Sequence, residues 1–424
     1  MSKHLSVKNA AAIVIGNAFE WYDYFVYSFL GIYLAKLFFP SSNDINSLLA
    51  VTATFGASFF MRPLGGLILG RIADKYSRVR AMNWSILLMS LALLMLSFAP
   101  TYHHAGILAP IIILTARLMQ GFSAGGECGI SGIILFESAP SDKRGLYCSL
   151  HNFGQMIAVQ LSLIVGIALT QSLSRAQIEQ WGWRIPFIIG LLIIPAGGYI
   201  RRSFKEPALA TPNRNSSLTD TVRDNLQKIL VVIGLVGGGT VAVYVLLSYM
   251  PTYVNVYLHI DISNAYIATL LGTGLMTMFI PVFGWLSDKA GRRRLLIIAL
   301  SSCLIEIYPC FAWLNAAPSF ERLLIIQCIL CFSMSLYFGA IMSAITEIFS
   351  YHVRSTCLAL SINTSVLIFG AFAQFMVTLL IKLFDNPIAV VIYPMCGIAI
   401  SLIATWFYQE SKEANLGYII PAMG

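Results

Sequence analysis

Long apolar stretches alternate with short polar breaks along the whole chain of 424 residues. A helix needs about 20 apolar residues to cross the hydrocarbon core of a bilayer, so each stretch predicts one membrane-spanning helix. The pattern predicts an all-α membrane protein with twelve transmembrane helices. The longest polar connection then divides it into a six-helix bundle in 1–201, a linker in 202–226 and a second six-helix bundle in 227–424 that ends in a short tail. The predicted spans are 11–38, 47–71, 80–99, 106–136, 146–172, 183–201, 227–257, 264–286, 293–314, 321–349, 355–383 and 388–408.

Composition excludes several classes of protein. Hydrophobic residues make up 58% of the chain and charged residues 11%, which no soluble fold of this length could accommodate. The net charge of +8 does not indicate a nucleic-acid partner, because the basic residues cluster between apolar stretches, as in the loops of membrane proteins. His, Cys and carboxylate residues show no catalytic or metal-binding spacing, so we expect no enzyme activity, no metal and no cofactor.

Lys and Arg are distributed unequally between the two sides of the predicted bundles. Of the 27 basic residues, 20 fall in the termini, the linker and the loops of one side, and 5 fall on the other. Basic loops remain in the cytoplasm, so we expect both termini there and the protein in a bacterial inner membrane. The first apolar run contains two acids and no cleavage site, which favours a retained span over a signal peptide.

One polar segment occurs twice at the same topological place. After the second span the chain reads G-R-I-A-D-K-Y-S-R-V-R (70–80), and after the eighth it reads G-W-L-S-D-K-A-G-R-R-R (284–294). The identities are in register at a constant offset of 214 residues, which indicates parallel halves related about the membrane normal. The aligned pairs include Gly70 and Gly284, Asp74 and Asp288, and Arg78 and Arg292.

These repeated residues suit a gate. Glycine lets helices approach closely, and an acid with arginine partners at adjacent helix ends forms a charge cluster that can break and reform. Anchoring by positive charge explains some of the Lys and Arg residues, but it does not require Asp74 or Asp288. We therefore interpret the segment as a gating motif.

The first predicted span carries polar side chains where lipid excludes them. Asn17, Glu20 and Asp23 recur every three residues, which places them on one helix face. Two neighbouring acids repel each other, so at least one of them should bind and release a proton. Glu20 and Asp23 are candidate proton-coupling groups in a cavity between the halves.

Two arginines and a further acid lie within predicted spans. Arg62 is in the second span, and Arg117 and Glu127 are ten residues apart in the fourth. A guanidinium can grip a substrate carboxylate with two hydrogen bonds, or it can neutralise an acid of the protein. Both interpretations stand for Arg62, and for Arg117 a structural or gating pair is favoured.

The fifth span begins with C-S-L-H-N-F-G-Q, which places His151 and Asn152 near one face. His151 could relay protons, although a solvated histidine near the helix end is the simpler interpretation. Aromatic residues in the first and seventh spans, among them Tyr24 and Tyr249, could form a wall that binds a quaternary ammonium. Many of these rings should be ordinary packing or interface residues.

Several stretches together resemble the metabolite:proton symporters of the major facilitator superfamily, a group with carriers of proline, glycine betaine, α-ketoglutarate and citrate. The matching segments are G-N-A-F-E-W-Y-D-Y-F-V-Y (16–27), M-R-P-L-G-G-L-I-L-G-R-I-A-D-K (61–75), R-L-M-Q-G-F-S-A-G-G-E (117–127), K-R-G (143–145), W-G-W-R-I-P-F (181–187), L-L-S-Y-M-P-T-Y (246–253) and G-W-L-S-D-K-A-G-R-R (284–293). They extend over nearly the whole chain.

The resemblance implies the major facilitator fold and proton-coupled uptake by alternating access. It makes Glu20 and Asp23 similar to the family's acids of the first span, and Arg62 similar to an arginine suited to a carboxylate. The chain departs from the pattern at Ser77, where the motif usually has glycine, and at Val79, where a second basic residue is common.

We therefore expect a proton symporter of a small solute that carries a carboxylate. A zwitterionic osmolyte such as proline or glycine betaine is the leading candidate, and an organic acid such as α-ketoglutarate or citrate is the alternative. A non-transporting membrane sensor of solutes is the hypothesis of another class. The expected partners are the solute, protons and lipid, and we expect a monomer.

Overall fold

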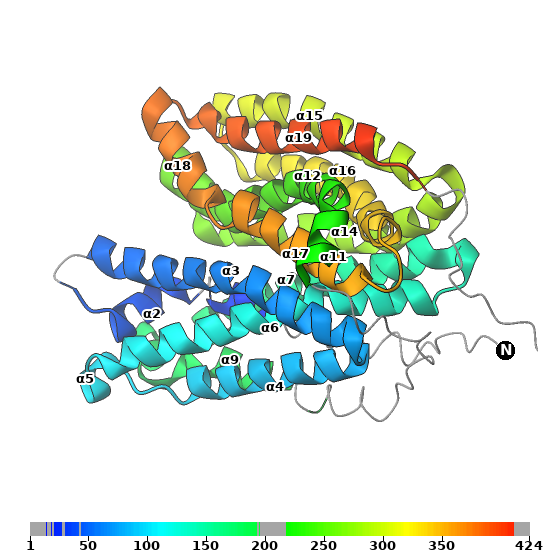
Figure 1. Ribbon diagram of the computed structural model, residues 1–424. Helices are drawn as coiled ribbons and strands as arrows, with labels where there is room; N and C mark the ends of the chain where they lie inside the picture. Colours follow the sequence, from blue (N-terminus) through cyan, green and yellow to red (C-terminus); the bar gives the residue numbers. More distant parts are fainter. Residues whose placement is uncertain are drawn as a thin grey trace, which may run out of the picture.

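The computed structural model describes residues 14, 18, 21–27, 30–41, 44–192, 195 and 218–410. These residues form helices and connecting turns without any strand. Figure 1 shows two groups of helices stacked on one another, one built from the chain up to residue 192 and one from residue 218 onward. We call them the N-half and the C-half.

Among its described residues the N-half contains four long helices and several short ones. Each long helix coincides with a predicted span, while the first and sixth spans lie partly outside the described residues. The helical segments are α2 (Gly31–Phe38), α3 (Asp44–Lys75), α4 (Arg78–Ser97), α5 (Tyr102–Ala105), α6 (Leu108–Ser138), η1 (Ser141–Lys143), α7 (Arg144–Ser172), α8 (Arg175–Gln177), η2 (Ile178–Gly182) and α9 (Arg184–Gly190).

The C-half shows the same correspondence with the predicted spans. A short helix, α11, lies within the predicted linker, and π-helical segments interrupt the seventh and eleventh spans, which the hydropathy pattern does not reveal. The segments are α11 (Leu218–Asp224), α12 (Leu226–Val243), η3 (Tyr244–Tyr249), α13 (Met250–Leu258), α14 (Ile262–Ala290), α15 (Arg292–Ala316), α16 (Phe320–Glu347), α17 (Arg354–Ser365), η4 (Val366–Gly370), α18 (Ala373–Phe384), η5 (Pro387–Val391) and α19 (Ile392–Phe407).

Nine helical segments among the described residues are long and apolar enough to cross a membrane. Large apolar side chains such as Met278, Ile305 and Trp406 are more than 70% exposed, which suits a surface solvated by lipid. The prediction of an all-α membrane protein is confirmed.

Glycines allow two helices of the N-half to pack backbone against backbone. A Cβ atom on Gly121 of α6 would collide with the backbone of Ser58 in α3, and one on Gly125 would collide with the backbone of Arg62. Close packing of small residues is the main source of helix association in a bilayer, where lipid is as apolar as the side chains. This contact fixes the position of Arg62 relative to α6.

Candidate functional site

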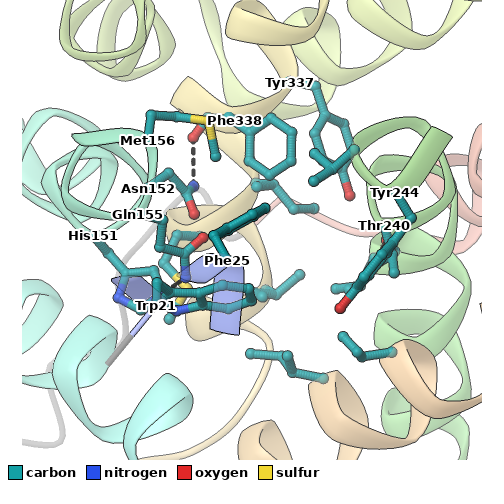
Figure 2. A pocket seen from close by; sticks show the side chains of 17 residues that line it. Trp21, Phe25, His151, Asn152, Gln155, Met156, Thr240, Tyr244, Tyr337 and Phe338 are labelled. Atoms are coloured by element: carbon teal, nitrogen blue, oxygen red, sulfur yellow. Dashed lines mark hydrogen bonds between the residues drawn. The ribbon is translucent and has the colours of Figure 1, made fainter. Parts of the chain in front are cut away.

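A cavity of about 100 Å³ lies between the two halves. The N-half contributes side chains from the first span and α7, and the C-half contributes α12, η3, α16, α17 and η4. Five of the lining residues are Trp, Tyr or Phe. Figure 2 shows these side chains around the space together with neutral polar groups. The labelled lining residues are Trp21, Phe25, His151, Asn152, Gln155, Met156, Thr240, Tyr244, Tyr337 and Phe338.

The polar side of the cavity comes from α7. His151, Asn152 and Gln155 all line the cavity, because Gln155 follows Asn152 by three positions and His151 by four, and such residues are neighbours on a helix surface. His151 Nδ1 is 3.0 Å from Ser131 Oγ, and His151 Nε2 is 2.9 Å from the amide nitrogen of Gln155. Asn152 donates a 2.7 Å hydrogen bond to the carbonyl of Phe338 in the opposite half (Figure 2). The α7 residues therefore both line the cavity and join the halves.

Arg62 lies beside the cavity wall at the junction of the halves. Its side chain is buried, and its guanidinium lies 5.3 Å from the ring centre of Trp21, 5.4 Å from that of Tyr24 and 5.6 Å from that of Phe59. Arg62 Nε donates a 3.2 Å hydrogen bond to Asn363 Oδ1 of α17. Aromatic faces stabilise a desolvated cation, so this position can keep a positive charge next to the cavity.

Arg117 forms an ionic cluster inside the N-half. Its guanidinium is 3.5 Å from the Asp23 carboxylate and donates a 2.7 Å hydrogen bond to Gln120 Oε1, while the Gln120 amide donates to Asp23. Arg117 also lies 4.3 Å from the ring centre of Tyr27 and 4.8 Å from that of Tyr24. Arg117, Gln120 and Asp23 are all fully buried and lie outside the set of cavity-lining residues. The structural pairing favoured for Arg117 is present.

Two π-helical segments shape the aromatic side of the cavity. Tyr244 begins η3 and lines the cavity, whereas the predicted Tyr249 ends the same segment, is buried, and is not among the lining residues. The Tyr244 ring meets Phe59 of the N-half edge-on, with 6.0 Å between ring centres. Segments with this wider helical turn occur frequently at functional sites. Tyr244 therefore supplies an aromatic contact between the halves.

The repeated segments lie at one end of the molecule, which we call the motif end. Asp74 accepts hydrogen bonds from the backbone N–H groups of Ser355 (3.1 Å) and Thr356 (2.7 Å) and from the Thr356 hydroxyl (2.6 Å). These donors form the first turn of α17 in the opposite half. A carboxylate there satisfies unpaired N–H groups and interacts favourably with the helix dipole.

Asp288 of the C-half makes the matching contact with a helix of the N-half. Its carboxylate accepts hydrogen bonds from the backbone N–H groups of Gly145 (2.6 Å) and Leu146 (3.0 Å), in the first turn of α7. Gly284 packs against Ser149 of α7, and Gly70 packs against Thr356 of α17 in the same way. We call the two carboxylate contacts the Asp74 clamp and the Asp288 clamp, and both join the two halves at the motif end.

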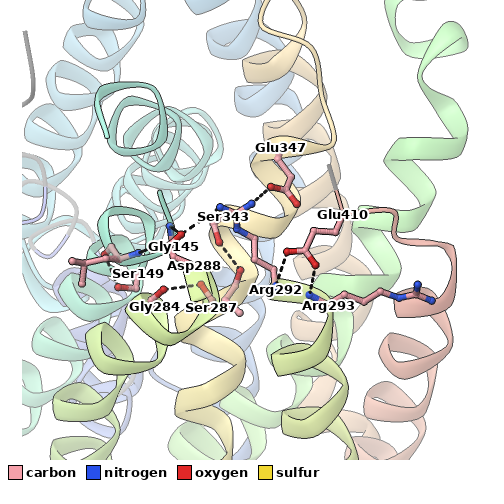
Figure 3. Close-up of polar contacts among 12 residues, drawn as sticks. Gly145, Ser149, Gly284, Ser287, Asp288, Arg292, Arg293, Ser343, Glu347 and Glu410 are labelled. Carbon is pink, nitrogen blue, oxygen red and sulfur yellow. Dashed lines mark hydrogen bonds and ion pairs between the residues drawn. The ribbon is translucent and has the colours of Figure 1, made fainter. Parts of the chain in front are cut away.

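Arginine–glutamate pairs surround the clamps. Arg292 donates to Glu347 (Figure 3). Its guanidinium also lies 3.5 Å from the Asp288 carboxylate. Arg354 of the C-half donates a 2.9 Å hydrogen bond to Glu137 of the N-half. The motif end therefore carries a charge network with contacts both within the C-half and across the halves.

The remaining candidates fall outside what the structure describes. Asn17 and Glu20 lie outside the described residues, as do the side chains of Arg78 and Glu127. Sequence reasoning missed Gln120, although its spacing from Arg117 by one helical turn was a usable signal. It also missed Asn363, a polar residue within an apolar span.

Comparison with known proteins gives the same picture of the fold. The xylose transporter XylE from Escherichia coli, in a partially occluded inward-open conformation, superposes with a TM-score of 0.74 at 16% identity, over 95% of this chain and 98% of that chain. At this identity the likeness concerns the fold alone.

Relatives that are named as transporters are closer in sequence. The chain is 32% identical to the citrate-proton symporter of Klebsiella pneumoniae, over 95% of this chain and 92% of that protein. It is 32% identical to the proline/betaine transporter of Escherichia coli strain K12, over 98% and 86%, and 30% identical to the α-ketoglutarate permease of the same strain, over 95% and 93%. The family model described as "Major Facilitator Superfamily" matches residues 13–373. With this match and an all-helical architecture of two packed halves, the chain belongs to the major facilitator superfamily as a proton-coupled transporter of small solutes.

Proposed function

We propose that this transporter carries a zwitterionic osmolyte, such as glycine betaine or proline, together with protons. The supporting observation is the cavity between the halves, with five aromatic rings in its wall and Arg62 beside it. Aromatic faces attract a quaternary or secondary ammonium, and a guanidinium binds a carboxylate. A zwitterion carries both an ammonium group and a carboxylate, so it can use both kinds of contact.

The charge of the cavity bears on the choice of solute. The described lining residues include no Asp, Glu, Lys or Arg. The nearby Arg62 guanidinium lies 5.3 Å from the ring centre of Trp21, which lines the cavity. A solute with zero net charge needs no further counter-ion in such a cavity, whereas a carboxylate with two or three negative charges needs several. This comparison favours an osmolyte over citrate or α-ketoglutarate.

Proton coupling is assigned to Asp23, with Glu20 as a further candidate. Protonation of Asp23 removes the negative charge that faces Arg117 at 3.5 Å, so the ionic cluster with Gln120 must rearrange. Asp23 and Trp21 are on the same short stretch of the first span, and Trp21 lines the cavity. A proton at Asp23 can therefore alter the shape of the solute site.

In the proposed mechanism, the clamps at the motif end control alternating access. Solute enters from the opposite end while the Asp74 and Asp288 clamps are intact, and the halves rock about the cavity when the clamps separate. The excess of Lys and Arg in the loops and termini of one side supports our proposal that the motif end and both termini lie in the cytoplasm of a bacterium. We take the halves, 1–201 and 227–424, as the moving units of a monomer in the inner membrane.

Counterflow in proteoliposomes tests the proposed solute. Purified protein is reconstituted with unlabelled glycine betaine, proline, citrate or α-ketoglutarate inside, and uptake of the same labelled compound is measured. We expect exchange of glycine betaine or proline and weak exchange of the acids. Exchange of citrate or α-ketoglutarate alone would establish the organic-acid alternative, which two of the relatives support by name. No exchange of any of the four would refute both versions.

A further inference from the structure

Residues 408–410, directly after α19, contact the motif end of the C-half. Tyr408 and Glu410 follow α19, and the Tyr408 hydroxyl donates to the Glu347 carboxylate. Glu410 accepts the backbone N–H of Arg292 at 2.8 Å through Oε1 and that of Arg293 at 3.5 Å through Oε2. Figure 3 shows Glu410 against the start of α15. Two side chains of the tail thus contact the second copy of the repeated segment.

The Arg293 side chain strengthens the same junction from the other direction. Its guanidinium donates to the backbone carbonyls of Thr405 (3.0 Å) and Trp406 (3.3 Å). These carbonyls belong to the last turn of α19, where helix acceptors lack intrahelical partners. The end of α19 and the start of α15 therefore satisfy each other's backbone groups.

The two halves cap the helix after the repeated segment in different ways. In the N-half, Ser77 Oγ accepts the backbone N–H of Arg80 at 3.1 Å and caps α4. The equivalent position in the C-half is Gly291, which has φ +94° and no side chain. Glu410 supplies the missing acceptor, and a Cβ at Gly291 would lie only 3.2 Å from Glu410 Oε2. The tail thus provides for α15 what Ser77 provides for α4.

Arg292 connects this tail contact to the Asp288 clamp. The backbone N–H of Arg292 donates to Glu410. The Arg292 guanidinium donates to Glu347 Oε2 and lies 3.5 Å from Asp288. Tyr408 occupies the other oxygen of Glu347, Oε1. The position of Arg292, and through it the electrostatic environment of Asp288, is therefore set from both sides by the tail.

We propose that Tyr408 and Glu410 form a tail latch that stabilises the state closed at the motif end. They are positioning residues, since the contacts described above all lie within the C-half. They hold Arg292 and Glu347 in the arrangement that keeps Asp288 aimed at the first turn of α7. The latch therefore preorganises one side of the clamp. This inference rests on the alternating-access part of the proposed function but does not depend on the solute.

Distance measurements between spin labels test the latch directly. Asp142→Cys and Ser350→Cys place labels on exposed positions of the two halves at the motif end, in a full-length chain whose native cysteines are replaced by serine. We expect a short distance in the parent protein in nanodiscs. In Glu410→Ala a longer distance should appear, with the open-to-closed ratio raised about fivefold, since loss of a helix cap has an effect of this size. Tyr408→Phe should shift the ratio in the same direction.

Matched variants separate the latch from general damage. Glu321→Gln removes an exposed acid from the first turn of α16, at the opposite end of the molecule, and should leave the distances unchanged. Glu410→Gln keeps one acceptor oxygen and should shift the ratio less than Glu410→Ala, and this variant serves as the test should Glu410→Ala fail to fold. Parent-like distances in both Glu410→Gln and Tyr408→Phe, or an equal shift in Glu321→Gln, would overturn the latch. Because counterflow reports the solute separately, failure of the proposed solutes leaves this test intact.

Discussion

Removal of the Asp74 carboxylate should open the motif end. Asp74 accepts hydrogen bonds from two backbone N–H groups and one hydroxyl at the start of α17, at 3.1, 2.7 and 2.6 Å. In the open state water replaces these donors, so the net contribution is far smaller than three isolated bonds. Hydrogen bonds to a charged group contribute about 1.5–3 kcal/mol, and a charge at a helix N-terminus adds about 0.3–1 kcal/mol.

These terms together give an estimate for Asp74→Ala. We expect the closed state to lose about 2–4 kcal/mol relative to the open state, which corresponds to a rise in the open-to-closed ratio of about 30- to 900-fold. Asp74→Asn keeps one carbonyl acceptor and loses the charge, so its shift should be about tenfold. The same spin-label pair measures both variants. A distance distribution for Asp74→Ala that superimposes on that of the parent protein would refute the clamp as a source of closure.

Four further predictions concern the cavity and the helix packing. Asp23→Asn should abolish solute accumulation driven by a pH gradient while sparing exchange, and unchanged accumulation would remove Asp23 from proton coupling. Trp21→Ala should weaken glycine betaine binding about 5- to 30-fold, as measured by isothermal titration, because a cation–π contact in a dry site contributes about 1–2 kcal/mol. Arg62→Gln should raise KM at least about tenfold for every carboxylate solute, and equal KM values would place the carboxylate elsewhere. Gly125→Val should lower the melting temperature because its side chain would collide with the backbone of α3, whereas Gly56→Ala, in open space, should not.

The positions of the clamp acids could be predicted from sequence, but their partners could not. The repeat at an offset of 214 residues identified Asp74 and Asp288 as a matched pair. Their acceptor contacts are with backbone N–H groups of α17 and α7, and every residue except proline has such a group. No side-chain pattern distinguishes the N–H groups that a carboxylate will meet.

The aromatic side of the cavity shows a different limit. The sequence contains Tyr244 and Tyr249 in the same span, and we selected Tyr249 as the cavity residue. In η3 the backbone has a wider turn than an α-helix, so the face on which each side chain lies changes within the segment. The residue pattern alone therefore did not indicate which of the two tyrosines lines the cavity.

Hydropathy, charge and the internal repeat determined the class of this protein from its sequence alone. Apolar runs long enough to span a bilayer, together with 58% hydrophobic residues, allow only a helical membrane protein, because a lone helix satisfies its own backbone in lipid. These signals are local or repeat at a fixed spacing, so they can be recognised in the sequence without knowledge of how the helices pack.

Tertiary structure decided how the polar groups are shared between halves. Arg117 and Asp23 pair inside the N-half, Arg62 meets Asn363 across the interface, and Glu410 caps a helix more than 100 residues earlier in the chain. Such contacts depend on which helix faces approach after packing, and the approach is set by backbone–backbone contacts at glycines and by the two clamps. Residue type and spacing along the chain do not indicate which helix faces will come into contact, so only the tertiary structure reveals these contacts.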